Sequence, residues 1–557
     1  MILDLTSKSH LNEDDSRFLD EIEEGVRSAY NEFIKELIHL NNLKGIDLLV
    51  DVTCRNPGKS SLLLNACKLQ LVKERLKENI KFSSIKIDNK FLKNPIMELL
   101  RNYNNSSCNV VVTDSSNNII FIIIKNIIRS IHGSINNIFW SRYYNLKKIP
   151  STSITYVDTF LLSNSFDNEG NFYDRYYTGF EKFLEPDQNT KIWFAPVIEA
   201  GMRKQKEYKD FFLKISRSKT NFLIEESWLN FTDYFVCFFH SLIIPLKIKK
   251  IPLIKNHNFS DLIKNELHQQ IGSFSLVRTI SKYKFINKLK KKQIAIDRAI
   301  DWHENQVIDR ALNLGFKEFY PDVEVHGYQG FMIPDFYANV QPQKYEKLLN
   351  TIPDVIHAIG PYAHAYRKGV DKDLKVQKSP ALRFSYLKDI SLETSTNLCI
   401  VFILPMVLEE CSILIKSALS LINNTEYKKS IYLKLHPTYE LDYFKTLIKE
   451  AQDNRLNFVS DNIPSLLSRA SIIISSTSSA IFEAFSLGIP VGIMANNSGV
   501  SLNPLPKDLL ESSLIYNEAD LIRFIENNIT EPKKRKNQSK RFLYFPSTDL
   551  VRKLFLG

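Results

Sequence analysis

A histidine and a cluster of hydroxyl residues follow two apolar segments in the last third of the chain. His436 and Pro437 end the apolar run 431–437, where proline stops the predicted strand. The second segment, 471–476, leads into the hydroxyl cluster of Ser475, Ser476, Thr477 and Ser478. An imidazole N–H, hydroxyls and the free amides of a helix N-terminus can all donate hydrogen bonds to phosphate. One capping serine would leave the other hydroxyls unexplained, so we predict a pocket for a nucleotide phosphate.

Carboxylates at three positions could serve the same chemistry. Glu483 lies in the helix predicted after the hydroxyl cluster, where it could accept hydrogen bonds from a ribose or remain on the surface. Asp167 and Glu169 lie in the polar loop SFDNEG, where either carboxylate could remove the proton of an acceptor hydroxyl. The alternative for this loop is an acidic turn in which Gly170 supplies a positive φ.

Further polar residues in the middle of the chain could line a ligand-binding cleft. Glu304 and Gln306 begin a predicted helix, and Tyr328 and Gln329 end the next predicted strand. Arg383 could pair with a carboxylate or a phosphate through its bidentate guanidinium. Each of these side chains could instead cap a helix or pack in the core.

Residues 53–61, TCRNPGKSS, come near to a phosphate-binding P-loop. That loop requires G-x-x-x-x-G-K-[ST], and the chain supplies Gly58, Lys59 and Ser60. Thr53 takes the place of the first glycine and Pro57 removes a backbone amide, so we predict an ordinary turn rather than an NTPase site. No carboxylate–histidine cluster accompanies the predicted phosphate pocket, and we expect neither a metal nor a cofactor.

Alternation of strand and helix would position these residues. Four apolar strands are separated by helical patterns in the last unit: 398–405, 431–437, 471–476 and 489–494. This order predicts a parallel sheet covered on both faces, with ligands at the carboxyl ends of its strands. The whole chain is expected to divide into an amino-terminal α/β extension, 1–150, and two Rossmann-like units, 151–335 and 336–557.

The composition excludes several classes of protein. With 557 residues, 44% hydrophobic and 24% charged, the chain is long enough for about three folded domains. Six cysteines without a C-x-x-C pair fit neither a zinc cluster nor a disulfide framework. The acidic start MILDLTSKSHLNEDD is unlike a signal peptide, and we expect a cytoplasmic protein. The net charge of +11 suits an anionic ligand or membrane, and no motif for nucleic-acid binding is present.

Two stretches, 119–131 and 235–254, mix apolar and basic residues. They could be buried elements whose lysines reach water, or a membrane-facing patch that meets anionic headgroups. We expect burial in the core. Pro245 and Pro252 predict that no single helix runs through the second stretch.

The HP pair, the Ser/Thr cluster and the segment SSAIFEAFSLGIPV together resemble the carboxy-terminal domain of GT-B glycosyltransferases. They are most similar to bacterial sialyltransferases, Kdo transferases and CDP-glycerol-type polymer transferases. The resemblance implies that His436, Pro437, Ser475 and Ser476 hold the phosphate of a CMP- or CDP-activated donor, with Thr477 and Ser478 as alternates. SFDNEG is similar to the acidic motif of bacterial sialyltransferases, from which Asn168 departs.

Most of the chain also resembles a bacterial family of surface-carbohydrate biosynthesis. The matching pieces are CRNPGKSSLLLNACKLQLVKERL, SFDNEGNFYDRYY, HENQ, GYQG and SPALRFSYL. This family often has a histidine after the glutamine of GYQ, where this chain has Gly330. The resemblance therefore implies no role for a histidine at that position.

We expect a GT-B-like α/β protein in which two Rossmann-like domains face a cleft and an α/β extension precedes them. The expected function is metal-independent transfer of a sugar, a CMP-activated ulosonic acid such as sialic acid or Kdo, to a surface polysaccharide or a lipid-linked acceptor. A nucleotide-sugar epimerase of the same fold and a non-catalytic, membrane-associated assembly partner are the alternatives. A peripheral position on the inner face of the membrane would suit a lipid-linked acceptor.

Overall fold

The computed structural model describes most of the chain. The described residues are 1–7, 11–113, 118–144, 147, 149–162, 164–167, 169–199, 202, 204–332, 334–370, 372–392, 399–423, 430–436, 439, 441–444, 456–505, 514–528 and 537–557. Pro437 and Asn168, which the sequence singled out, lie outside these residues.

The amino-terminal extension holds a three-stranded parallel sheet in the order β1-β2-β3. Its strands are β1 (Ile2–Asp4), β2 (Ser84–Ile87) and β3 (Asn109–Val112). Its helices are α1 (Glu13–Leu40), α2 (Leu62–Lys77), α3 (Lys93–Asn102) and α4 (Ile119–Trp140). One hydrophobic core runs from these elements into the next unit without a break, because buried residues of both belong to one cluster.

The second unit is built on a six-stranded parallel sheet in the order β5-β4-β6-β7-β8-β9. The strands are β4 (Ile154–Leu161), β5 (Ile192–Ile198), β6 (Ile296–Trp302), β7 (Val325–Gln329), β8 (Val355–Ala358) and β9 (Lys375–Lys378). The helices are α5 (Pro186–Thr190), α6 (Gln205–Arg217), α7 (Phe231–Ile243), α8 (Ser260–Gln270), α9 (Phe274–Lys291), α10 (Val307–Phe319), α11 (Lys344–Leu348) and α12 (Pro361–Val370). The expected boundary after residue 335 falls inside this sheet, because β8 pairs with β7 and β9 pairs with β8.

The third unit carries a second six-stranded parallel sheet, β12-β11-β10-β13-β14-β15. The strands are β10 (Cys399–Ile403), β11 (Ile431–Lys434), β12 (Leu456–Val459), β13 (Ala470–Ser475), β14 (Val491–Met494) and β15 (Leu514–Ile515). The helices are α13 (Leu408–Asn423), α15 (Ile463–Arg469), α16 (Ala480–Ser486) and α17 (Glu518–Asn528). β10 and β13 are buried at every position, as expected for central strands covered on both faces. The predicted fold class, two parallel α/β units with an α/β extension, is confirmed.

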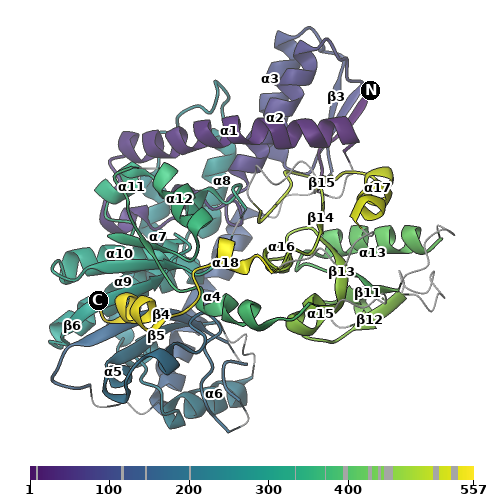
Figure 1. Cartoon of the computed structure of the whole chain (residues 1–557). Coiled ribbons are helices and arrows are strands. Elements are labelled where there is room, and N and C mark those ends of the chain that lie inside the picture. The colour runs from purple at the N-terminus through teal and green to yellow at the C-terminus, as the bar shows by residue number, and fades with distance from the viewer. Residues whose placement is uncertain are drawn as a thin grey trace.

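The end of the chain returns to the second unit. It forms α18 (Ser539–Phe542) and α19 (Thr548–Phe555), and Figure 1 shows α19 beside β4 and β6 rather than beside the third sheet. The Thr155 hydroxyl donates to the Phe555 carbonyl at 2.9 Å, and the rings of Phe180 and Phe555 stack at 4.6 Å. The last residues of the chain therefore connect the third unit to the second.

Helix α1 ties the two units together at the other end. It has 28 residues, so at 1.5 Å per residue it is about 42 Å long. In Figure 1 it runs across the upper part of the molecule, below α3. Its first half contacts the third unit, where Arg17 pairs with Asp520 at 3.0 Å. Its second half contacts the second unit, where Arg27 donates to the Gln341 side chain at 2.8 Å.

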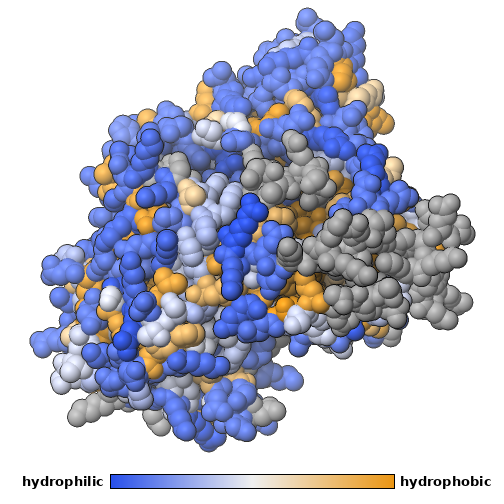
Figure 2. All heavy atoms as spheres, viewed as in Figure 1, coloured by the Kyte–Doolittle hydropathy of each residue, from blue (hydrophilic) through white to orange (hydrophobic). Residues whose placement is uncertain are grey.

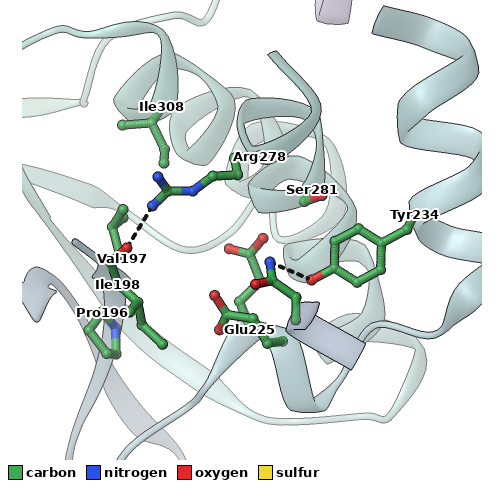
Figure 3. Close-up of a pocket in the computed structure, with 10 residues that line it drawn as sticks. Pro196, Val197, Ile198, Glu225, Tyr234, Arg278, Ser281 and Ile308 are labelled. Atoms are coloured by element: carbon green, nitrogen blue, oxygen red, sulfur yellow. Dashed lines mark hydrogen bonds between the residues drawn. The ribbon is translucent and has the colours of Figure 1, made fainter. Parts of the chain in front are cut away.

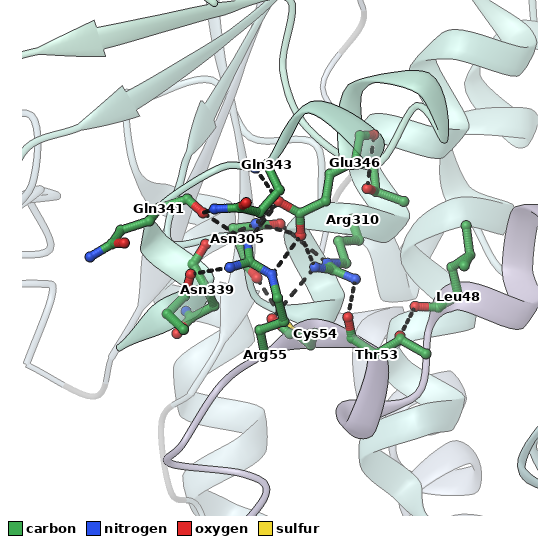
Figure 4. A network of polar contacts seen from close by, with 12 residues as sticks. Leu48, Thr53, Cys54, Arg55, Asn305, Arg310, Asn339, Gln341, Gln343 and Glu346 are labelled. Carbon is green, nitrogen blue, oxygen red and sulfur yellow. Dashed lines mark hydrogen bonds and ion pairs between the residues drawn. The ribbon is translucent and has the colours of Figure 1, made fainter. Parts of the chain in front are cut away.

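The segment that comes near to a P-loop is a joint between the extension and the second unit. Arg55 has no exposed surface and adopts a φ of 61°; its guanidinium contacts the Glu346 carboxylate at 2.7 Å (Figure 4). Arg310 pairs with the same carboxylate. The Ser60 hydroxyl donates to Glu266 at 2.7 Å. The prediction that this segment is an ordinary turn agrees with these contacts, because its polar groups are used within the protein.

The expected burial of residues 119–131 is wrong. In α4 the side chains of Phe121 and Ile128 are 65% and 61% exposed, because the helix turns only one of its faces toward α8 and α9. Among the described residues one segment, Ile119–Tyr143, is long and apolar enough to cross a membrane. In the second stretch α7 ends at Ile243, before Pro245, as predicted.

Candidate active site

A cleft of about 580 Å³ separates the carboxyl ends of the third unit's strands from the second unit. The wall from the third unit includes Lys434, His436, Thr477, Ser478, Ser479 and Glu483. The wall from the second unit includes Arg175, Tyr176, Trp302, Glu304, Tyr337 and Arg383. Parallel α/β sheets bind ligands at this edge, so this cleft is the candidate site. The face of the molecule in Figure 2 is largely hydrophilic, with hydrophobic residues scattered over it.

The hydroxyl cluster divides into two buried and two accessible members. Ser475 is fully buried and donates to the Ile403 carbonyl at 2.5 Å. Ser476 is also buried and donates to the Glu410 carboxylate, which Thr477 contacts at 3.1 Å. Thr477 and Ser478 line the cleft. The structure therefore brings Thr477 and Ser478 to the ligand side and turns the hydroxyls of Ser475 and Ser476 into the protein.

His436 lies at the cleft, two residues beyond the end of β11. Its partial burial and the nearby guanidinium of Arg175 lower the pKa of the imidazole below its usual value. A lowered pKa leaves the imidazole neutral at pH 7, when one ring nitrogen carries a proton that can be donated. Lys434 lines the same wall, because alternate residues of an extended segment point the same way.

Glu483 and Arg383 face each other across the two units. Glu483 lies in α16, where burial raises its pKa to about 7 and the positive charge of Arg383 acts in the opposite direction. The Tyr386 hydroxyl donates to the Glu483 carboxylate.

Glu304 is held in place from several sides. The Trp302 indole donates to one of its carboxylate oxygens at 2.9 Å, and the Gln306 amide donates to the other. Asp309 accepts hydrogen bonds from the backbone amides of Glu304 and Gln306 at 3.0 and 2.9 Å, which starts α10 at the next residue. Glu304 thus presents a positioned carboxylate to the cleft, and the Gln306 side chain helps to hold that carboxylate through its hydrogen bond.

A buried polar cluster lies on the same segment as Glu304. Ligand-type atoms of Asp301, His303 and Asp309 lie within 4.8 Å of one another, and all three residues are buried. His303 contacts Asp301 at 2.9 Å, and burial lowers the pKa of His303 to about 3. Asp309 already accepts the two amides described above. These contacts fit a positioning role for the cluster, and the expectation of a metal-independent reaction stays a prediction.

Asp167 and Glu169 do not line the cleft as the structure describes it. The Asp167 carboxylate accepts the backbone amides of Glu169 and Asn171 at 2.9 and 2.8 Å, and Gly170 has a φ of 86°. These hydrogen bonds lower the pKa of Asp167, with the Asn171 side chain as the largest cause. The geometry matches the acidic turn that was the alternative interpretation of this loop.

Tyr328 and Gln329 are buried beneath the cleft. The Tyr328 hydroxyl donates to the Pro380 carbonyl at 2.8 Å, and the Gln329 amide donates to Val340 at 3.2 Å. A Cβ atom on Gly330 would lie 2.5 Å from the Tyr328 ring and 2.6 Å from the Trp302 ring. Glycine is therefore the residue that fits this position, which explains why no histidine stands there.

Arg175 and Lys434 line the cleft and Glu410 holds Ser476 and Thr477, but none of the three was predicted from the sequence. Lys434 had a signal, because it precedes His436 by two residues on a predicted strand. Arg175 follows an irregular loop, and Glu410 contacts Ser476 across 66 residues of chain. Neither position follows from a local pattern.

The charges around the cleft define what it can bind. Arg175, Arg383 and Lys434 bring positive charge, and His436 adds a neutral donor. The carboxylates among its described lining residues are Glu304 and Glu483, and the second is half neutral near pH 7. Such a cleft fits an anionic ligand with several hydroxyl groups, because phosphate needs cations and sugar hydroxyls need carboxylate acceptors.

No known family model matches the sequence, and no curated protein matches it. Solved structures with a similar fold include UDP-N-acetylglucosamine 2-epimerase from Rickettsia bellii, at 12% identity and a TM-score of 0.37 over 72% of this chain and 95% of that one. The lipopolysaccharide outer core galactosyltransferase WaaB has 12% sequence identity and a TM-score of 0.37, over 72% of this chain and 94% of that one. The wall teichoic acid polymerase TagF has 11% sequence identity and a TM-score of 0.32, over 78% of this chain and 91% of that one. At these values the likeness carries no argument about activity or substrate.

Proposed function

We propose that the chain is a glycosyltransferase that takes its sugar from a nucleotide-linked donor. The observation that carries this proposal is the composition of the cleft, where two parallel sheets bring cations, hydroxyls and a positioned carboxylate to one cavity. The finer proposal is a CMP-activated ulosonic acid as donor and a surface polysaccharide or lipid-linked molecule as acceptor. A ulosonic acid carries a carboxylate besides the phosphate, and the cleft offers guanidinium groups on Arg175 and Arg383 for a second anion.

The third unit would hold the leaving group. Four residues that line the cleft would donate to phosphate oxygens: Lys434, His436, Thr477 and Ser478. Glu483 would accept hydrogen bonds from ribose hydroxyls. As the bond from the anomeric carbon to the phosphate oxygen breaks, its electron pair goes to the phosphate. Donors fixed around that oxygen stabilise the charge without reorganising.

The second unit would supply the base. Glu304 opens onto the cleft, whereas Asp167 is engaged in its own turn, so we assign proton removal to Glu304. Its carboxylate takes the proton of the acceptor hydroxyl while that oxygen bonds to the anomeric carbon. The Trp302 indole and the Gln306 amide keep the carboxylate aimed, which reduces the cost of reaching the reactive geometry.

A panel of CMP, CDP, UDP, GDP and ATP in thermal-shift measurements tests the proposal. We expect CMP or CDP to raise the melting temperature of the wild type and to have a much smaller effect on His436→Ala. His240→Ala, a partly buried histidine on α7 outside the cleft, is the matched control and should respond like the wild type. Conversion of the donor to an isomer without transfer to any acceptor would indicate an epimerase instead.

A further inference from the structure

Helix α4 presents a continuous stripe of apolar side chains to solvent. The stripe consists of Phe121, Ile124, Ile128, Ile131, Ile135 and Phe139. These residues are spaced by three or four, which places them on one face of the helix, and each is between 47% and 65% exposed. A helix of a globular protein normally turns such a stripe toward the core, and exposed patches of this kind mark interaction sites.

The opposite face of α4 is fixed to the protein along its length. The Ser130 hydroxyl donates to the Gly272 carbonyl at 2.5 Å, and Asn126 donates to Gln269 at 2.7 Å. A Cβ atom on Gly133 would lie 2.5 Å from the Phe274 ring, so the helix touches the start of α9 without a gap. A helix anchored in this way lies on the surface of the protein rather than crossing a membrane alone.

Helix α7 extends the apolar stripe. Phe231, Phe235, Phe239 and Ile243 recur every four residues and are between 37% and 66% exposed. The Asn137 side chain of α4 donates to the Tyr234 hydroxyl of α7 at 3.4 Å, shown as the dashed line to Tyr234 in Figure 3. The two stripes are therefore carried by neighbouring helices, and we call them together the α4–α7 face.

Positive charge borders the α4–α7 face. Lys125, Arg129 and Arg142 are exposed on α4 and directly after it, and the sequence of α4 contains no aspartate or glutamate. Lys249 and Lys250, exposed shortly after α7, add to this charge. None of these five cations forms an ion pair with a residue that the structure describes. By contrast, Asp233 of α7 is paired with Lys288 at 2.9 Å.

We propose that the α4–α7 face docks onto an anionic lipid bilayer, with its phenylalanines and isoleucines inserted at the headgroup boundary. Apolar side chains bordered by uncompensated lysine and arginine are the pattern that suits such a surface, since the alkyl and aromatic groups enter the bilayer and the cations meet lipid phosphates. A protein partner or a second copy of this chain would leave these like charges facing another folded surface. The proposal is independent of the chemistry assigned to the cleft.

Co-sedimentation of the full chain with vesicles tests it. We expect binding to vesicles of phosphatidylcholine mixed with phosphatidylglycerol, and much weaker binding to phosphatidylcholine alone. The double variants Phe121→Ser/Ile128→Ser and Phe235→Ser/Phe239→Ser should each bind about tenfold or more weakly, because each removes apolar area from the bilayer. Lys125→Glu/Arg129→Glu should weaken binding mainly at low salt, where charge attraction is least screened.

Leu348→Ser is the matched control, since Leu348 is 77% exposed on α11, outside this face, and should bind like the wild type. Melting temperatures close to wild type would show that the variants are folded.

Two results would overturn the proposal: wild-type protein that binds neither vesicle type, or apolar variants that bind anionic vesicles as strongly as the wild type. A dimer in solution that the same variants dissociate, without vesicle binding, would assign the face to a second copy. Nucleotide binding should be unchanged in every variant, which separates this test from that of the cleft.

Discussion

Glu483 and His436 show how burial prepares two side chains of one cleft for opposite roles. Burial disfavours the charged form of each, so it raises the pKa of Glu483 to about 7 and lowers that of His436. Near pH 7 the imidazole is neutral and the carboxyl group is partly protonated. The site can therefore offer a neutral N–H to phosphate and a titratable acceptor to a sugar.

The raised pKa of Glu483 predicts a loss of stability as pH rises. The folded protein keeps this proton up to about pH 7, whereas the unfolded chain releases it near pH 4.5. The free energy of unfolding should therefore fall between these values by roughly 3 kcal/mol from this residue alone, and stay level above them. Glu483→Gln should remove that part of the fall. Denaturant unfolding at pH 5 and pH 8 measures it, and an equal pH dependence in both proteins would contradict the prediction.

Glu304 is predicted to act as the base. Substitutions distinguish this assignment from a base in the acidic loop that holds Asp167 and Glu169. Glu304→Gln keeps the hydrogen bond with Trp302 but cannot take a proton, so kcat should fall by about 10²–10⁴ with little change in donor KM. Asp167→Asn and Glu169→Gln, assayed separately, should retain most of the activity. Initial rates over a range of donor concentrations give kcat and donor KM for each variant. A large loss of kcat in either loop variant would assign the base to that loop instead.

At the scale of elements, the local sequence pattern predicts where strands and helices form, whereas tertiary contacts decide which of their side chains are exposed. The third sheet could be predicted because its strands are short apolar runs between helices. His436 could be predicted because it closely follows one of these strands. The exposure of α4 could not, since a helix rich in isoleucine has the same sequence pattern whether it faces a core or a bilayer. The orientation of Ser475 also depended on a distant partner, the Ile403 carbonyl.

The joint around Arg55 is predicted to stabilise the fold rather than to bind a nucleotide. Arg55→Ala would leave Glu346, which is fully buried, with one fewer cation, and should lower the free energy of unfolding by about 3–5 kcal/mol. Lys59→Ala, an exposed residue of the same segment, should change it by less than about 0.5 kcal/mol. Chemical denaturation compares the two. ATP hydrolysis that Lys59→Ala abolishes would contradict this assignment.

At the scale of the whole molecule, two connections hold the walls of the cleft together. α1 contacts both units, and the end of the chain returns from the third unit to the second. The amino-terminal extension thus has a structural part in the site even though none of its described residues lines the cleft. Its α4 also carries one of the two stripes of the α4–α7 face, so the same extension connects the walls of the cleft and contributes to the proposed membrane contact.

Titration calorimetry of nucleotide binding tests most directly whether both units build one donor site. Wild-type protein should bind CMP or CDP, and both Arg175→Met, from the second unit, and Lys434→Met, from the third, should weaken the affinity about tenfold or more. Ser475→Ala, whose hydroxyl faces the protein, should keep the wild-type affinity. Wild-type protein that binds none of the nucleotides, or an Arg175→Met variant that binds as tightly as the wild type, would contradict a donor site shared between the two sheets.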